Sequence, residues 1–168
     1  DAAIVVTGCL AQRAADELKL PGVRLVLGTQ RRGEVVQLLE KAMEQDVALI
    51  AVQTLRQAPF EHLMVHAHEG HTRATMKIQE GCDRFCAYCL IPFARGHVRS
   101  RDPEEVVLEA RTLVEQGFKE IILTGINTAL YGTEEGFDYP LMADEEGFTG
   151  IEIIIKRINQ LPGEFRIR

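Results

Sequence analysis

The sequence predicts an α/β fold built on parallel strands. Short runs rich in β-branched residues, such as 4–7 and 23–27, alternate with segments whose apolar residues recur at helical spacing. A later run, 121–123, is apolar throughout, as a strand buried on both faces of its sheet requires. Such alternation of strand-like and helix-like segments is typical of a parallel sheet covered by helices.

The first part of the chain contains two predicted strand–helix units and a third strand. In order, these are a strand at 4–7, a helix at 10–18, a strand at 23–27, a helix at about 31–45 and a strand at 47–52. Cys9 follows the first strand, at the edge of the sheet where ligand sites usually form. Taken by itself, such a lone thiol is more often a small buried side chain than a ligand.

Helical and strand periodicity stops between residues 53 and 72, where four histidines gather. Nothing in their spacing places them on one face of a helix or strand. We therefore interpret the stretch as an interdomain linker and not as a metal site. The four are His62, His66, His68 and His71.

The second part of the chain resumes the alternation. In order, we predict a strand at 73–80, a helix from Asp102-Pro103 to Gly117, a strand at 121–123, a helix at 151–161 and the start of a strand at 165–168. Thr124, Gly125 and Asn127 follow the second of these strands. They should share one edge of the sheet with the loop that leaves residue 80, because the carboxyl ends of parallel strands meet there.

That loop carries three cysteines, Cys82, Cys86 and Cys89, at C-x3-C-x2-C spacing. Three thiolates on one short loop can converge on an iron–sulfur cluster and leave one iron open for chemistry. A disulfide framework is disfavoured, because it is typical of small secreted chains with an even set of nearby cysteines. A zinc site remains an alternative, although it usually shows paired C-x2-C knuckles.

Charge is distributed unevenly along the chain, whose net charge is −6. Residues 133–147 hold six acids and no Lys or Arg, whereas residues 73–101 carry a local excess of four positive charges. The field around the cysteines should attract anions. If 95–101 is extended, Arg95 and the basic residues at alternate positions after it share one side, and Arg95 is a candidate donor to a cofactor carboxylate or phosphate.

Composition excludes a membrane span, because no apolar run approaches the roughly 20 residues that a spanning helix needs. Lone and clustered thiols fit a reducing, cytoplasmic compartment. The acidic net charge argues weakly against a nucleic-acid partner, since such domains are often basic.

The cysteine motif, with Tyr88 directly before its last cysteine, resembles that of the radical S-adenosylmethionine (radical-SAM) superfamily. Residues 77–82 and 91–96 resemble the methylthiotransferase branch, which modifies adenosine next to the anticodon of tRNA. Residues 7–12 are similar to the third cysteine motif in the amino-terminal domain of that branch. Residues 123–128 most resemble the subgroup that acts on N6-threonylcarbamoyladenosine.

This resemblance implies that Cys82, Cys86 and Cys89 hold a [4Fe–4S] cluster whose fourth iron binds SAM. An electron donor would reduce the cluster, and cleavage of SAM would give a 5′-deoxyadenosyl radical that abstracts hydrogen from carbon 2 of the base. Tyr88 would lie near the adenine of SAM. Its methionine part would lie near Thr124, Gly125 and Asn127.

The resemblance further implies a second [4Fe–4S] cluster on three cysteines of the amino-terminal domain, of which this chain has only Cys9. We therefore expect a fragment: residues 1–54 from a Rossmann-like domain, 55–72 as linker, and 73–168 as the first strands of a partial (β/α) radical-SAM barrel. The parent would add a 2-methylthio group to N6-threonylcarbamoyladenosine in tRNA, and the fragment would be inactive alone. Alternatives are a radical-SAM enzyme acting on another modified adenosine or a ribosomal protein, and a zinc-binding structural module.

Overall fold

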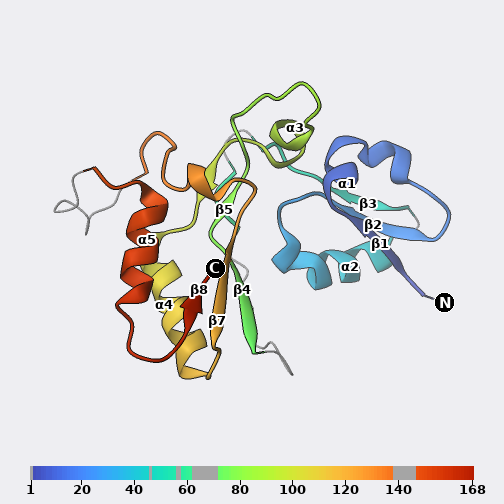
Figure 1. Ribbon diagram of the computed structural model, residues 1–168. Coiled ribbons are helices and arrows are strands. Elements are labelled where there is room, and N and C mark those ends of the chain that lie inside the picture. The colour runs from blue at the N-terminus through green and yellow to red at the C-terminus, as the bar shows by residue number, and fades with distance from the viewer. Residues whose placement is uncertain (1, 46, 56–57, 62–71, 138–146) are drawn as a thin grey trace. The chain divides into compact units, whose positions relative to one another are not determined.

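Two separate parallel sheets organise the chain in the computed structural model, which describes residues 2–45, 47–55, 58–61, 72–137 and 147–168 (Figure 1). The contacts divide these residues into two units. The first unit takes its residues from 1–63 and 83–97, and the second takes its residues from 64–82 and 98–168. The α/β class with parallel strands is therefore confirmed.

The sheet of the first unit has the order β1-β2-β3, and both pairings are parallel. Its strands are β1 (Ile4–Thr7), β2 (Val23–Leu27) and β3 (Leu49–Ala51). Leu25, Leu27 and Ala51 pack against the helix α2 (Val35–Met43), whereas Val26 packs with Ala11 on the other face. The central strand is buried on both faces, which explains why all of its residues except Arg24 are apolar.

The helices of the first unit are shorter than the sequence predicts. The stretch expected as one helix at 10–18 forms α1 (Cys9–Arg13) and the 3-10 helix η1 (Ala15–Leu18), because Ala14 leaves the helical region with φ −137°. The helix expected at 31–45 begins as η2 (Arg32–Glu34) and continues as α2. A further short helix, α3 (Ile91–Arg95), packs on α1. Thr29, which follows β2, also donates its hydroxyl proton to the Ala94 carbonyl of α3 at 3.1 Å.

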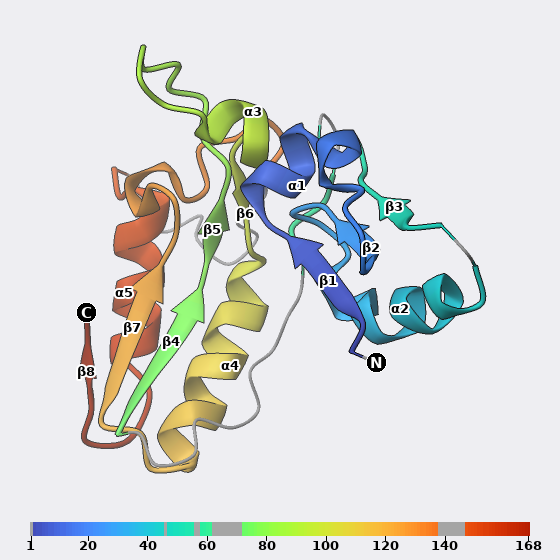
Figure 2. The same ribbon diagram turned by 90° about the vertical axis from the view of Figure 1, so that its right-hand side faces the viewer.

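The second unit contains a parallel sheet with the order β4-β7-β8. Its elements are β4 (Arg73–Lys77), α4 (Pro103–Glu115), β7 (Glu120–Thr124), the 3-10 helix η3 (Thr128–Leu130), α5 (Gly150–Asn159) and β8 (Arg166–Ile167). Both long helices pack on one apolar cluster that includes Met76 and Ile121, and Figure 2 shows them beside the strands. Each parallel pair is thus joined through a helix, as the sequence predicts.

A two-stranded antiparallel sheet extends the end of β4. It pairs β5 (Gln79–Glu80) with β6 (Arg99–Ser100), so the chain leaves along β5, forms the cysteine loop and α3, and returns along β6. The first sheet and the strands β4 and β7 confirm the alternation predicted from sequence. β5 lies within the strand predicted at 73–80, whereas its pairing with β6 and the helix α3 were not predicted.

The predicted domain boundaries at residues 54 and 73 stay a prediction. Most of the expected linker, including His62, His66, His68 and His71, lies outside the described residues. Within the part of the chain that the structure describes, no helix has the length and apolar character that crossing a bilayer requires.

Candidate functional site

The three clustered cysteines follow β5 directly. None of them forms a disulfide; Cys82 is only 7% exposed, whereas Cys86 is exposed and Cys89 is half-buried. The Cys89 amide donates to the Cys86 carbonyl at 2.9 Å, which closes a tight turn between the second and third cysteines. Since Cys9 is also free, the chain contains no disulfide.

This set of donors fits an iron–sulfur cluster chemically, because three cysteines that form no disulfide lie on eight consecutive residues outside regular secondary structure. Among the described residues, no group of three or more His, Cys, Asp or Glu side chains is already gathered as a metal site. Metal binding commonly orders its own ligands, and inside this loop the Cys86 and Cys89 amides donate to carbonyls only two and three residues earlier. Cys82, Cys86 and Cys89 thus stay predicted ligands.

The turn after β7 lies beside the start of the cysteine loop. Lys77 pairs with Thr124 in the parallel register, and the Ile78 amide donates to the Thr124 carbonyl at 2.9 Å. The predicted sharing of one sheet edge is therefore confirmed within the second unit. The Thr124 hydroxyl donates to the Met76 carbonyl at 3.3 Å, whereas Gly125 and Asn127 are exposed.

Gln79 is a site residue that sequence reasoning missed. Strand alternation places it on the polar side of its strand, yet it is 0% exposed and lies between the cysteine loop and the turn after β7. Its side chain accepts a hydrogen bond from the Asn127 amide at 3.0 Å and donates one to the Gly81 carbonyl at 2.7 Å. In the sequence, the signal was a polar residue two positions before Gly81, the glycine that begins the cysteine loop. In the structure, this residue faces the turn that contains Gly125.

The aromatic side chains of the cysteine loop and of α3 are exposed to solvent. Tyr88 is 94% exposed, so the described residues do not enclose its ring. Phe85 and Phe93 meet edge to face with their centroids 5.7 Å apart, and the Arg13 guanidinium lies 5.6 Å from the Phe93 centroid. The role predicted for Tyr88 at an adenine stays a prediction.

Cys9 is the first residue of α1 and is half-buried. It follows Gly8, whose φ of +112° turns the chain from β1 into the helix. Arg95, at the end of α3, donates from Nε to the Cys9 sulfur at 3.3 Å. The structure thus brings together two predicted site residues that lie 86 positions apart, although neither role is tested by this contact.

The predicted basic face of residues 95–101 is wrong in its geometry. Arg95 belongs to a helix that ends at Gly96 with φ +77°, so the segment is not continuously extended. Arg99 and Arg101 are buried, and they contact buried acids: Arg99 lies 3.7 Å from Glu80, and Arg101 pairs with Glu109. These pairs neutralise positive charge that the sequence predicts to be free for anions.

Neighbouring charges are also paired. The Lys77 ammonium lies 2.6 Å from a Glu80 carboxylate oxygen, and His97 lies 2.6 Å from Asp83. The local excess of positive charge therefore acts on ligands through fewer groups than a count along the sequence suggests.

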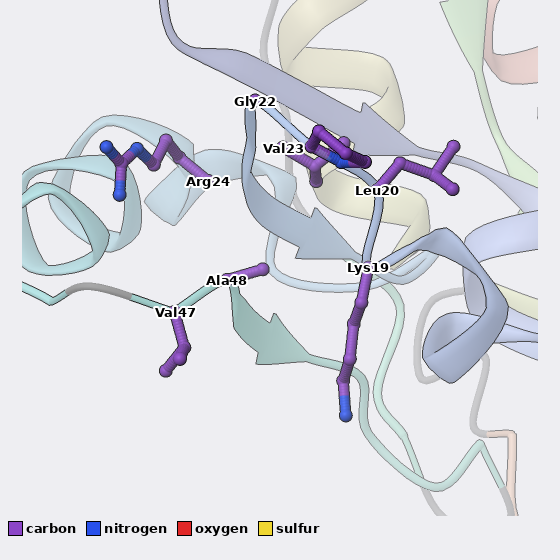
Figure 3. Close-up of a pocket in the computed structure, with 8 residues that line it drawn as sticks. Lys19, Leu20, Gly22, Val23, Arg24, Val47 and Ala48 are labelled. Atoms are coloured by element: carbon purple, nitrogen blue, oxygen red, sulfur yellow. The ribbon is translucent and has the colours of Figure 1, made fainter.

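A hollow of about 650 Å³ in the first unit has no predicted site residue in its lining (Figure 3). Leu20, Val23 and Val47 line it, so it opens where β2 and β3 begin, whereas Cys9 follows the end of β1. Lys19, on its rim, is paired with Asp16 at 2.7 Å. No cysteine lines the hollow, so it has no part in the chemistry proposed for the cysteines.

Residues 76–166 match the family model of the radical SAM superfamily, a segment that includes the cysteine loop and both turns at the carboxyl edge of β4 and β7. The chain belongs to the radical SAM superfamily. Membership in the radical SAM superfamily implies a [4Fe–4S] cluster and S-adenosylmethionine as cofactors. It confirms the resemblance noted in the sequence and removes the main support for a zinc-binding module.

Several methylthiotransferases are similar to this radical SAM chain. A threonylcarbamoyladenosine tRNA methylthiotransferase of Bacillus subtilis is 47% identical over 141 residues, which are 83% of this chain and 31% of the relative. A protein of the same name from Aquifex aeolicus is 37% identical over 91% of this chain and 38% of its own length. A tRNA-2-methylthio-N6-dimethylallyladenosine synthase of Staphylococcus epidermidis is 35% identical over 91% of this chain and 30% of its own length. The chain thus spans about a third of the length of these relatives.

Proposed function

We propose that the chain is part of a radical-SAM methylthiotransferase that adds a 2-methylthio group to N6-threonylcarbamoyladenosine in tRNA. The supporting observation for the reaction class is the superfamily match over a loop with three cysteines at the carboxyl edge of a parallel sheet. For the substrate, the support is the 47% identity to a relative named for threonylcarbamoyladenosine, against 35% to one named for dimethylallyladenosine.

In this proposal Cys82, Cys86 and Cys89 hold the [4Fe–4S] cluster as thiolates. When bound, the cluster supplies the one-electron reduction by which S-adenosylmethionine is cleaved, after an electron donor has delivered that electron. The protein binds and orients the reactants and keeps water away from them. The hydrogen bond from the Cys89 amide to the Cys86 carbonyl holds two of the three cysteines on one tight turn.

Thr124, Gly125 and Asn127 are the proposed neighbours of the methionine part of SAM. Their place beside the start of the cysteine loop supports the assignment, because the amino and carboxylate groups of SAM must reach the cluster held there. Tyr88 is the proposed neighbour of the adenine, since its exposed ring is available for stacking.

Cys9 is the proposed ligand of a second cluster, which would need further ligands from outside these 168 residues. Arg95 supports that role from α3, because its guanidinium lies within hydrogen-bond distance of the sulfur and is thus in the surroundings that such a cluster would occupy. This contact assigns Arg95 to the surroundings of Cys9. A direct contact of Arg95 with SAM, expected from the sequence, stays a prediction.

The proposed macromolecular partner is tRNA, together with an electron donor, and the proposed compartment is the cytoplasm, where tRNA is modified. The decisive test expresses the protein, in the length in which its cell makes it, in a bacterial host lacking its own methylthiotransferases. Mass spectrometry of the tRNA nucleosides should show 2-methylthio-N6-threonylcarbamoyladenosine. Methylthiolation of dimethylallyladenosine instead would support the second candidate, which the 35% identical relative suggests.

The role of the cysteine loop has its own test. Cys86→Ala should abolish reductive cleavage of SAM and lower the iron and sulfide content of anaerobically purified protein, whereas Cys9→Ala should leave the cleavage of SAM in place. Zinc without iron and sulfide in the unaltered protein would refute the enzyme proposal.

A further inference from the structure

The Gln79 side chain uses its whole amide group between two backbone segments. Its nitrogen donates to the Glu80 carbonyl at 2.9 Å and to the Gly81 carbonyl at 2.7 Å. Its oxygen accepts from the Asn127 amide at 3.0 Å. A glutamine amide offers two N–H donors and one carbonyl acceptor, so both kinds of group are satisfied inside the protein. The side chain therefore joins the cysteine loop to the turn after β7.

On the loop side, Gln79 fixes the peptide that leads into the first cysteine. The Gly81 carbonyl and the Cys82 nitrogen belong to one planar peptide unit, so the hydrogen bond to that carbonyl orients the backbone of Cys82. Gly81 has φ +74°, which only glycine adopts readily. The backbone turns sharply there, and the Gln79 amide holds the turn in one orientation.

On the turn side, Gln79 lies directly against Gly125. A Cβ atom at position 125 would lie 2.9 Å from the Gln79 Cβ and 3.2 Å from the Gln79 carbonyl oxygen. The Gln79 Oε1 atom would lie 2.8 Å away, and contacts shorter than 3.0 Å force a neighbour to shift, so only glycine fits here without displacing Gln79. The strand β5 and the turn are therefore packed backbone to backbone, with the amide of Gln79 bridging them to Asn127.

We propose that Gln79 is a positioning residue, which holds the Cys82 backbone and the turn at 125–127 at the separation that lets SAM bridge them. This rests on the proposed function, in which Cys82 holds the cluster and the turn holds the methionine part of SAM. Glu80, the other residue of β5, contacts Lys77 and Arg99. Gln79 is therefore the side chain with hydrogen bonds to both halves of the proposed site.

Two variants separate the parts of the interaction. Gln79→Glu keeps the length and the acceptor for the Asn127 amide, but an ionised carboxylate cannot donate to the Gly81 carbonyl. Gln79→Met keeps the approximate volume and removes every hydrogen bond. In both variants we expect the dissociation constant for SAM to rise about tenfold, because the lost hydrogen bonds hold the two halves of the proposed SAM site together and are each worth on the order of a factor of ten or less.

The measurement is a SAM titration of the anaerobically reconstituted protein, in the length in which the cell makes it. The electron paramagnetic resonance spectrum of the reduced cluster reports SAM binding without turnover. Iron content and thermal midpoint are measured on the same samples. The matched control is Glu120→Gln, which removes a buried charge contacting Arg166 at the opposite end of β7 and should lower thermal stability without moving the SAM midpoint.

The outcomes separate the two proposals. A wild-type SAM midpoint in either folded, cluster-loaded Gln79 variant overturns the positioning role, whereas a wild-type protein that binds no SAM overturns the proposed function instead. Hydrogen exchange of the unaltered protein provides a test that needs no variant. Slow exchange of the Asn127 amide is expected, and fast exchange in the folded protein contradicts the bridge.

Discussion

At the scale of the residue, position 125 tolerates no side chain, because its space is filled by the backbone and Cβ of Gln79. We expect Gly125→Ala to destabilise the protein by about 1–3 kcal/mol, the usual effect of overpacking a fixed contact. Gly125→Ser should be at least as harmful. Thermal unfolding of the cofactor-free protein measures this, and an unchanged midpoint for the alanine variant would show that the contact yields easily.

A second residue-scale prediction concerns Glu152. Hydrogen bonds from the Thr149 hydroxyl and the Thr149 amide, both at 2.7 Å, lower the pKa of the Glu152 carboxyl. A depressed pKa stabilises the folded state above the ordinary carboxyl range near 4.5, and that stabilisation is lost as pH falls through the depressed folded value. The wild type should exceed Glu152→Gln in stability at neutral pH, and the difference should shrink on acidification. Denaturant unfolding at several pH values tests this.

The buried arginines show what residue counting misses. The sequence correctly predicts many positive charges near the cysteines, but Arg99 and Arg101 are buried against Glu80 and Glu109. Pairing depends on where β6 and α4 bring distant residues together, and neither charge pattern nor spacing contains that information. Gln79 escaped detection for the same reason, since its partners come from the turn after β7.

At the scale of the element, α4 begins at a strong cap. The Asp102 carboxylate accepts hydrogen bonds from the Glu104 and Glu105 amides at 2.9 and 3.1 Å, and Pro103 occupies the first turn. Asp102→Ala should lower stability by about 1 kcal/mol, which for a chain of this size shifts the melting temperature by roughly 2–4 °C. Asp102→Asn, which retains a capping oxygen, is the control and should remain near the wild type. Equal melting temperatures for all three proteins would contradict the capping role.

Elements with clear periodicity were predictable and short ones were not. The strands of both parallel sheets follow apolar runs, and α4 and α5 follow capping signals and apolar spacing. The two-residue strands β5 and β6 and the five-residue α3 are too short to show a period. The break at Ala14 lay inside an intact apolar pattern, so only the backbone conformation reveals it.

At the scale of the whole molecule, the chain carries one clustered set of three cysteines and one separate cysteine. Anaerobic reconstitution of the 168-residue chain should therefore load a single [4Fe–4S] cluster. Iron and sulfide analysis measures the loading, with Cys86→Ala expected to lose it and Cys9→Ala expected to retain it. Loading of two clusters would mean that Cys9 finds its remaining ligands within the chain.

The fold class and the candidate cysteines could be predicted because each depends on residues that lie close together in the sequence. The alternation of apolar runs determines the α/β layers, and C-x3-C-x2-C spacing identifies three thiols on one loop. The support around those thiols could not be predicted, because Gln79, Gly125 and Asn127 meet only after β4 and β7 have paired.

Because β5 pairs with β6, the cysteine loop can change in length without changing the geometry of the parallel sheet. Gln79 faces Ser100 and Glu80 faces Arg99, so the chain returns next to the point where it left. Residues inserted between β5 and β6 would lengthen that connection and leave the register of β4 on β7 unchanged. Doubling such a loop adds only about 0.6 kcal/mol of closure entropy. The segment that bears the thiols can thus change in length while the pairing of β5 with β6 stays in place.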